Sequence, residues 1–383
     1  MTRNESRAFR LRSTVIGLAL AVAAGGIAAA QAPDIKVGVF GPLTGPAAAD
    51  GNGCLYATQL AGDQANAKGG INGRKVTIVS ADDQAKPSEG IAAVQKLVSR
   101  DGAIAVVSCS YSGATRSAAP VAQQAKVPMV VAYAVHPDIT RAGEYAWRIF
   151  SLGPVQGHAI AVMAREDGKA GRAAVLWAKN DYGESISTAA TQRFTALGGQ
   201  VVLSEPFALG DKDFTTLLTK VRAATPDVLL VVGYYNEGAL LVQQARRLGL
   251  TMPVYASDGL SAPKFVELAG TAAEGVVVSA ATDLTSSLFK AFAQEFEARH
   301  KYVPDSVPSH GYDAMLVVLE ALRRGGASAD GVLKGLGEMK EFTGVNGTIV
   351  FTPEREIRTD QSFWKIQGGR FTQYKLVPYD RVK

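Results

Sequence analysis

Short apolar runs alternate with longer amphipathic segments along most of the chain. The runs IKVGVFG, KVTIVS, AIAVVS and VPMVVAY each end at glycine, proline or small polar residues. Between them lie the helix patterns CLYATQLAGDQANAKGG, PSEGIAAVQKLVSRDG and ATRSAAPVAQQAK. Gly69 and Gly70 are expected to close the first helix, and Ser88 is the expected N-cap of the second. This alternation indicates βαβ units, and the uninterrupted apolar strands indicate parallel sheets that are covered on both faces.

The same alternation begins again after residue 150. Strand patterns AAVLWAKNDYG, QVVLSEPF, DVLLVVGYYN and MPVYAS are separated by the helix patterns ISTAATQRFTALGG, DFTTLLTKVRAATP and EGALLVQQARRLGL. The chain of 383 residues therefore contains two α/β blocks, at 33–150 and 151–279. Residues 280–383 hold two more helix patterns and three strand patterns, too few for a third doubly wound domain. We expect them to complete the two blocks.

Residues 1–32 have the pattern of a secretory signal peptide. Four arginines precede the apolar segment STVIGLALAVAAGGIAAA, and Ala30-Gln31-Ala32 offers a small-x-small cleavage site. The alternative is an uncleaved membrane anchor, which the shortness of the apolar run disfavours. Removal of this segment would lower the formal net charge from +5 to +2, so the charge gives no reason to expect a nucleic-acid partner. We expect a periplasmic protein.

The chain has two cysteines, Cys54 and Cys109. Export to an oxidising compartment would allow a disulfide between them, whereas two buried thiols are an equally ordinary outcome. The sequence does not give the separation of their Cα atoms, so both alternatives stay open.

The stretch SCSYSGATR joins an apolar strand to a helix and offers hydroxyl groups at that junction. Free backbone N–H groups at a helix N-terminus attract anions, and the hydroxyls of Ser112 and Thr115 add donors around Gly113. This arrangement is typical of a carboxylate site. The alternative is that Ser112 or Thr115 only caps the helix.

The second block offers different chemistry at its strand ends. Tyr182, Tyr234 and Tyr235 are amphipathic aromatic residues that can cover an apolar ligand and donate a hydrogen bond. Asp258 can neutralise an ammonium group. The alternatives are core packing for the tyrosines and a turn before Gly259 for Asp258.

Enzyme motifs are missing from the sequence. It contains no G-x-x-x-x-G-K-[ST] and no G-x-S-x-G motif, its four histidines are scattered, and no Cys/His cluster suits zinc. We therefore expect a protein without catalytic residues, metal or cofactor. A hydrolase that uses cleft carboxylates is the remaining enzymatic alternative.

The assembled motifs resemble those of a known family. They are IKVGVFGPLTGPAAADG, ANAKGGINGRKVTIVSADDQAKP, SGATRSAAPVAQQAKVPMV, KNDYGES, GDKDFTTLLTKVRAATPDVLLVVGYYNEGALLVQQARRLGL and GTIVF. Over residues 35–375 the chain resembles the substrate-binding proteins of branched-chain amino acid ABC transporters, which have the type I periplasmic binding fold. The resemblance implies two doubly wound parallel-sheet lobes joined by three crossing segments, near 149–152, 279–283 and 340–348. Lobe 1 would combine 33–150 with 280–342, and lobe 2 would combine 151–279 with 343–383, with the ligand in the cleft between them.

The resemblance also implies roles for individual residues. Ser112 matches the serine whose hydroxyl and backbone meet the ligand carboxylate. Tyr133 and Ala134 fall in the loop whose backbone carbonyl helps to hold the ammonium group. Tyr182 and Tyr234 match the tyrosines that close on the ligand, and Asp258 stands where the family often has a glutamate that pairs with the ammonium.

Three positions depart from the family pattern. Val135 replaces a usual threonine, Asp50 replaces a tyrosine that often covers the ligand side chain, and Asp258 is one methylene shorter than glutamate. We expect a branched-chain or related amino acid as ligand. The alternative is an aromatic or aliphatic carboxylate, or an amide, without an α-amino group.

The expected partner is the membrane permease of an ABC transporter, and the protein itself is expected to be a monomer. A sensory ectodomain is a further alternative, but it would need a second membrane segment and a signalling domain, and the sequence offers no pattern for either.

Overall fold

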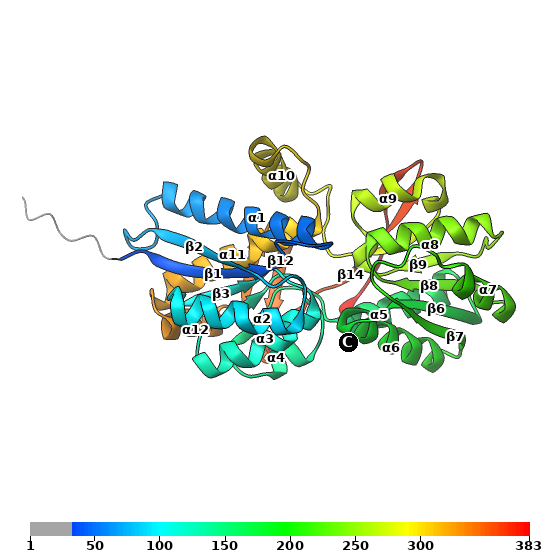
Figure 1. Cartoon of the computed structure of the whole chain (residues 1–383), viewed down its shortest axis with the longest axis horizontal. Helices are drawn as coiled ribbons and strands as arrows, with labels where there is room; N and C mark the ends of the chain where they lie inside the picture. The colour runs from blue at the N-terminus through cyan, green and yellow to red at the C-terminus, as the bar shows by residue number, and fades with distance from the viewer. Residues whose placement is uncertain (1–32) are drawn as a thin grey trace, which may run out of the picture. The chain divides into compact units, whose positions relative to one another are not determined.

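The computed structural model describes residues 33–383 (Figure 1). The expected signal peptide, residues 1–32, lies outside the described residues. Within 33–383, none of the helices combines the length and the apolar composition that crossing a bilayer requires.

The first sheet has five parallel strands in the order β2-β1-β3-β4-β5. Its strands are β1 (Ile35–Gly41), β2 (Val76–Asp82), β3 (Ala105–Ser108), β4 (Met129–Val131) and β5 (Ala146–Arg148). The helices between them are α1 (Ala48–Ala67), α2 (Pro87–Gln95) with the π-helical turn η1 (Lys96–Arg100), α3 (Ser112–Ala125) and the short α4 (Asp138–Arg141).

Both faces of this sheet are buried, as the apolar strands predicted. Adjacent residues of β3 point to opposite sides: Val106 packs in one apolar cluster, with residues of α3, and Val107 packs in another. Figure 1 shows α1 on one face and α2 and α3 on the other. The N-cap of α2 is Lys86 rather than the expected Ser88, because Pro87 occupies the first helical position, where its fixed φ suits the helix.

The second sheet has seven strands in the order β15-β14-β10-β9-β8-β6-β7. They are β6 (Arg172–Ala178), β7 (Gln200–Phe207), β8 (Val228–Val232), β9 (Val254–Ala256), β10 (Val277–Ala280), β14 (Gln361–Gln367) and β15 (Arg370–Val377). The associated helices are α5 (Gly153–Val162), α6 (Asp181–Ala196), α7 (Thr215–Ala224), α8 (Tyr235–Arg247) and α9 (Pro263–Ala269), and the short helical turns are η2 (Met163–Asp167), η3 (Asp258–Leu260), η4 (Gly270–Ala273) and η5 (Tyr379–Arg381).

Two strands of the second sheet run against the others. β14 pairs with β10, and β15 with β14, in antiparallel register. Only Gly368 and Gly369 separate β14 from β15, both with positive φ, and a parallel pair would need a crossover of a dozen or more residues. The expected parallel sheet therefore ends in an antiparallel hairpin at one edge.

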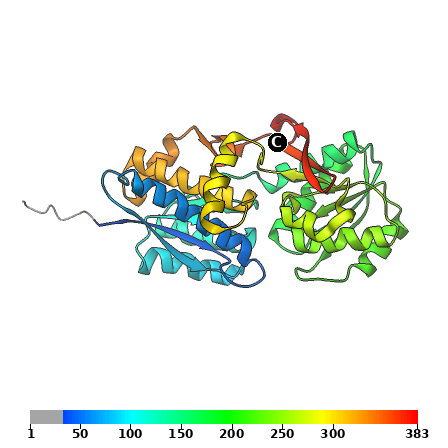
Figure 2. The same cartoon turned by 90° about the horizontal axis from the view of Figure 1, so that it is seen from above.

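Residues 281–360, which connect β10 to β14 in the chain, pack on the first sheet. They contain α10 (Ser287–His300), α11 (Ser306–Gly325), α12 (Ala329–Glu338) and a small antiparallel sheet of β11 (Glu341–Gly344), β12 (Gly347–Phe351) and β13 (Ile357–Arg358). In Figures 1 and 2 the helix α11 lies beside the blue α1, and α12 packs on α11. The red β14 instead joins the second sheet, where it pairs with β10.

The contacts of this segment displace one expected boundary. Asp313 of α11 accepts hydrogen bonds from the backbone N–H groups of Val345 and Asn346, and Arg148 of β5 lies 2.9 Å from Glu356, just before β13. Residues 343–358, assigned above to lobe 2, therefore contact residues of lobe 1. We propose that the third crossing lies at 359–360, since β14 joins the second sheet directly after it.

Candidate functional site

A cavity lies where the carboxyl ends of the strands of the two sheets meet. It encloses about 600 Å³ of empty space, part of it open to solvent. Of the residues expected at the site, seven line it: Ser112, Tyr133, Ala134, Tyr182, Tyr234, Tyr235 and Asp258. They follow β3, β4, β6, β8 and β9, which is the edge where parallel sheets present ligand sites.

Ser112 is the first residue of α3 and has one hydrogen bond that fixes it. Its Oγ accepts from the backbone N–H of Val135 at 3.0 Å, which leaves the hydroxyl proton free to be donated to a ligand. The side chain of Val135 is fully buried, so this residue acts through its backbone.

Two expected residues of the same stretch face away from the cavity. The hydroxyl of Thr115 is buried and lies 2.7 Å from that of Ser108, so it ties the helix to β3. A side chain at Gly113 would point towards Pro87 and Asp181. Neither residue lines the cavity.

The loop after β4 is held by an arginine. Arg148 is fully buried and donates to the carbonyl oxygens of Ala134 and His136, both at 2.7 Å. The hydroxyl of Tyr133 donates to the carbonyl oxygen of Cys109. Because the Ala134 carbonyl already binds a guanidinium, a ligand ammonium at that oxygen would lie next to a like charge.

On the second sheet's side, Tyr182 and Asp258 form a hydrogen-bonded pair. The Tyr182 hydroxyl donates to Asp258 Oδ1 at 2.6 Å and accepts from the N–H of Gly259 at 3.0 Å. Burial raises the pKa of Asp258 to about 6, although the Tyr182 hydrogen bond opposes the shift. A cationic ligand group would favour its ionised form.

Three tyrosine rings stack along the cavity. Tyr182 stacks on Tyr234 with centroids 5.0 Å apart, and Tyr234 stacks on Tyr111 with centroids 4.7 Å apart. Tyr111 directly precedes α3, so the stack joins residues of the first sheet to residues of the second. The Tyr111 hydroxyl donates to Asp50 Oδ2 at 2.6 Å.

Several lining residues were not expected from the sequence: Tyr111, Phe150, Asp305, Ser306 and Val307. Tyr111 stands immediately before Ser112, so the strand-to-helix junction that predicted Ser112 could also have predicted Tyr111. Asp305 is the N-cap of α11 and accepts from the N–H of Val307, a helix-start signal that says nothing about a ligand. Asp50, noted only as a departure, also lines the cavity.

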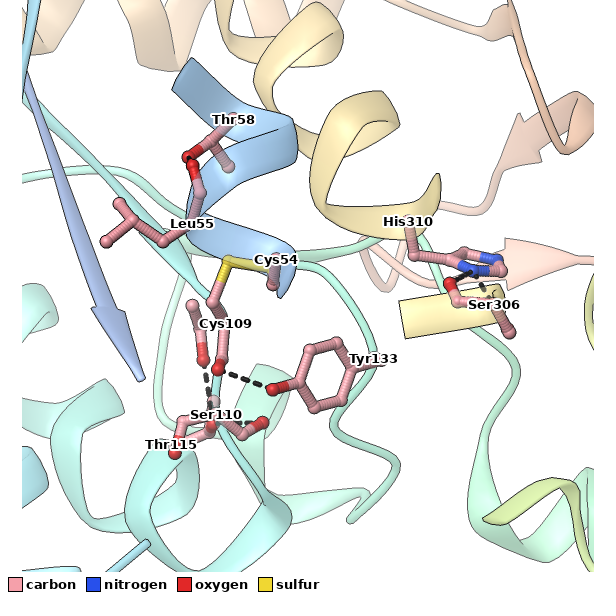
Figure 3. The surroundings of a disulfide bond; sticks show 10 residues. Cys54, Leu55, Thr58, Cys109, Ser110, Thr115, Tyr133, Ser306 and His310 are labelled. Carbon is pink, nitrogen blue, oxygen red and sulfur yellow. Dashed lines mark hydrogen bonds between the residues drawn. A yellow bond between two sulfur atoms is a disulfide. The ribbon is translucent and has the colours of Figure 1, made fainter. Parts of the chain in front are cut away.

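The two cysteines are bonded, so of the two open alternatives the structure has the disulfide. Cys54 of α1 and Cys109 have Cα atoms 5.7 Å apart. Figure 3 shows the bond beside Ser110, Thr115 and Tyr133, with the Tyr133 hydroxyl directed at the Cys109 carbonyl. The disulfide therefore fixes α1, which carries Asp50, to the loop that carries Tyr111 and Ser112.

Comparisons with known proteins agree on one family. The model of the periplasmic binding protein family matches residues 34–369. The Leu/Ile/Val-binding protein BraC3 of Rhizobium johnstonii is 31% identical over 342 residues, which cover 88% of this chain and 93% of that protein. The leucine-, isoleucine-, valine-, threonine- and alanine-binding protein of Pseudomonas aeruginosa is 29% identical over 80% of this chain and 83% of its own length.

A solved structure gives the same result for the fold. The branched-chain amino acid transporter substrate-binding protein LivJ from Streptococcus pneumoniae, determined with isoleucine, has a TM-score of 0.83 and 27% identity. The match covers 90% of this chain and 99% of that one. The expected two-lobe α/β fold is therefore confirmed.

Proposed function

This chain belongs to the periplasmic binding protein family, and from that premise we propose that it is the solute-binding protein of an ABC importer with a small amino acid as its ligand. The cavity between the ends of two sheets carries this proposal, because it is lined both by a hydroxyl donor at a helix N-terminus and by the partly buried carboxyl group of Asp258. The relatives named for branched-chain amino acids support the same ligand class.

The ligand contacts follow from these groups. Ser112 and the free N–H groups at the start of α3 would hold the ligand carboxylate. Asp258, oriented by Tyr182, would hold the ammonium group, and Tyr234 would cover the ligand. Because these residues belong to different lobes, the ligand would stabilise the closed arrangement and so drive hinge closure.

The setting of the protein is part of the same proposal. We expect a periplasmic monomer, exported by residues 1–32, that delivers its ligand to a membrane permease and leaves it chemically unchanged. The lobes would be 33–150 with 281–358, and 151–280 with 361–383.

A thermal-shift screen tests the proposal. Purified protein, stripped of ligand by unfolding and refolding, is melted with amino acids, with aromatic and aliphatic carboxylates, and with amides. Binding to the folded state raises the melting temperature by mass action. We expect amino acids to stabilise the protein, and Asp258→Asn and Ser112→Ala each to lower their affinity about 10- to 100-fold, because each removes a bond to a charged group.

Two results would contradict it. Stabilisation by carboxylates without an amino group, and by no amino acid, would remove the ammonium role of Asp258 and leave the transport role. Chemical conversion of a stabilising compound during the incubation would indicate the hydrolase alternative.

A further inference from the structure

The cavity has more acidic groups than a simple amino acid requires, and this excess identifies the ligand further. Resting on the function proposed above, we propose that the ligand is an amino acid with a second cation on its side chain, bound between Asp50 and Asp305 while its α-ammonium group pairs with Asp258. Lysine, ornithine and arginine have this chemistry.

The charge of the cavity is the first observation. Three aspartates line it, Asp50, Asp258 and Asp305, and none of the described lining residues is lysine, arginine or histidine. An amino acid with a neutral side chain brings one ammonium group, which would pair with Asp258, so it would leave Asp50 and Asp305 without a counter-charge. The three carboxyl groups are partly exposed, and a bound ligand would cover them. Covered carboxylates without a counter-charge are costly, and a second ligand cation supplies one.

The acidic groups are bonded to different tyrosines. Asp258 is bonded to Tyr182, and Asp50 is bonded to Tyr111. The ring of Tyr234 stacks on Tyr182 at a centroid distance of 5.0 Å and on Tyr111 at 4.7 Å, so the two bonded pairs meet Tyr234 separately. We assign the α-ammonium group to Asp258 and the second cation to Asp50 and Asp305. The two nitrogens of an extended lysine lie about 7 Å apart by bond geometry, which suits two separated carboxyl groups.

Asp50 and Asp305 both line the cavity, and each has one acceptor atom that is not used. Tyr111 donates to Asp50 Oδ2, and the N–H of Val307 donates to Asp305 Oδ1. Among residues 33–383, no hydrogen-bond donor reaches Asp50 Oδ1 or Asp305 Oδ2. Burial and the neighbouring Asp305 carboxylate raise the pKa of Asp50 to about 7, so a cation between the two groups would relieve their repulsion.

A branched aliphatic side chain would fit poorly in the part of the cavity that Asp50 and Asp305 line. It would cover the two carboxyl groups without giving them a donor, and an unpaired buried acceptor costs about 1–3 kcal/mol, more when it is charged. Asp50 and Asp305 would therefore favour a ligand with an ammonium or guanidinium group over a ligand with a methyl group at this position.

Lysine and norleucine provide a matched pair for the test, because they differ by the terminal amino group alone. Isothermal titration of the stripped protein should show lysine, ornithine or arginine binding at least about 10-fold more tightly than norleucine or leucine. Asp50→Asn and Asp305→Asn should each lower the affinity for the basic amino acid about 10-fold or more and should raise that for norleucine, because asparagine removes the charge that an alkyl side chain would cover. Asparagine keeps the shape at both positions and the helix cap at Asp305, and melting curves check that both variants fold.

The surface variant Asp380→Asn is the control, since Asp380 is exposed and distant in the chain from the cavity residues; it should bind as the unchanged protein does. Equal or tighter binding of norleucine or leucine would overturn the inference and leave the proposed function standing. If no amino acid bound at all, the inference and the proposed amino acid function would fail together.

Discussion

At the scale of single residues, tyrosine hydroxyls orient two of the carboxyl groups in the cavity. Tyr111 donates its proton to Asp50, and Tyr182 donates its proton to Asp258, both at 2.6 Å. A hydroxyl has one proton to give, so each tyrosine fixes one carboxylate oxygen and leaves the other for the ligand. The rings of Tyr111 and Tyr182 stack on the ring of Tyr234. The same two residues therefore provide an apolar wall of the cavity and orient its carboxyl groups.

The raised pKa of Asp50 predicts how the stability of the ligand-free protein depends on pH. Its folded-state pKa of about 7 lies above the ordinary value of 3.8, so between these values the folded protein binds more protons than the unfolded chain. The stabilising contribution is thus present at low pH and lost as the pH rises towards 7. In Asp50→Asn this loss should be absent, so its melting temperature should fall less between about pH 5 and pH 8 than that of the unchanged protein, by about 1–3 °C.

Melting curves of stripped protein over this range measure the effect. Asp258 has a raised pKa of about 6 and contributes in the same direction, so a residual slope is expected in Asp50→Asn. An equal slope in both proteins would mean that Asp50 ionises normally.

At the scale of elements, one buried arginine joins three segments. Arg148 of β5 donates to the loop that follows β4 and lies beside Glu356 in the segment before β13. The loop carries Tyr133 and Ala134, which line the cavity, and only residues 359–360 separate β13 from β14 of the second sheet. Arg148 therefore links the cavity-lining loop to the segment that leads into the second sheet.

Replacing Arg148 by methionine should destabilise the protein by about 3–5 kcal/mol, because Glu356 would remain buried without its partner. Urea unfolding monitored by tryptophan fluorescence measures the change. The double variant Arg148→Met, Glu356→Gln should recover part of the loss, since it removes the unpaired charge. Arg141→Met is the matched control, because the Arg141 side chain is 74% exposed, and it should change stability by less than about 0.5 kcal/mol. A similar effect of both single variants would contradict the role of Arg148.

At the scale of the whole molecule, the two lobes contact each other outside the cavity as well. Arg116 of α3 lies 3.2 Å from Asp181 of α6 and 3.2 Å from Asp138 of α4. Its side chain is nearly half exposed, so its ion pairs are screened by water and salt.

We predict that Arg116→Ala raises the dissociation rate of the ligand by less than about fivefold, because an exposed ion pair contributes at most about 1 kcal/mol to the closed state. Stopped-flow tyrosine fluorescence during ligand displacement measures this rate. The association rate should change little, since Arg116 does not line the cavity. A loss of affinity as large as that of Asp258→Asn would show that this contact, rather than the ligand, determines closure.

The sequence predicted the parts of the fold that local patterns encode. Alternating apolar runs and helices identified the parallel strands β1–β4 and β6–β9, but not the short parallel strands β5 and β10. They missed α5, whose apolar residues surround the helix and leave no amphipathic period, and α12, whose glycines resemble a loop. In α12, a side chain at Gly335 would strike the backbone of Ala321, so glycine there permits close contact with α11. That reason is visible only after the two helices are packed.

The residues that line the cavity were likewise predicted where a local sequence pattern places them, and missed where only tertiary packing does. Ser112, Tyr182, Tyr234 and Asp258 follow strands directly, so the rule on strand ends found them. Asp305 comes from the start of α11, a helix from the C-terminal third of the chain that reaches the cavity through tertiary packing. No local pattern connects it with Asp50, which lies in the first turn of α1.

The antiparallel insertion of β14 beside β10 has a consequence for how the chain is made. Ribosomes deliver the residues in order, and the last residue that lines the cavity, Val307, is complete well before Gln361. A nascent or truncated chain that ends between these two residues would contain every residue that lines the cavity. The edge of β10, however, would lack β14 and would be open to pairing with a strand of another molecule. The final hairpin thus supplies no residue to the lining of the cavity, and correct folding of the chain depends on it to cover the edge of β10.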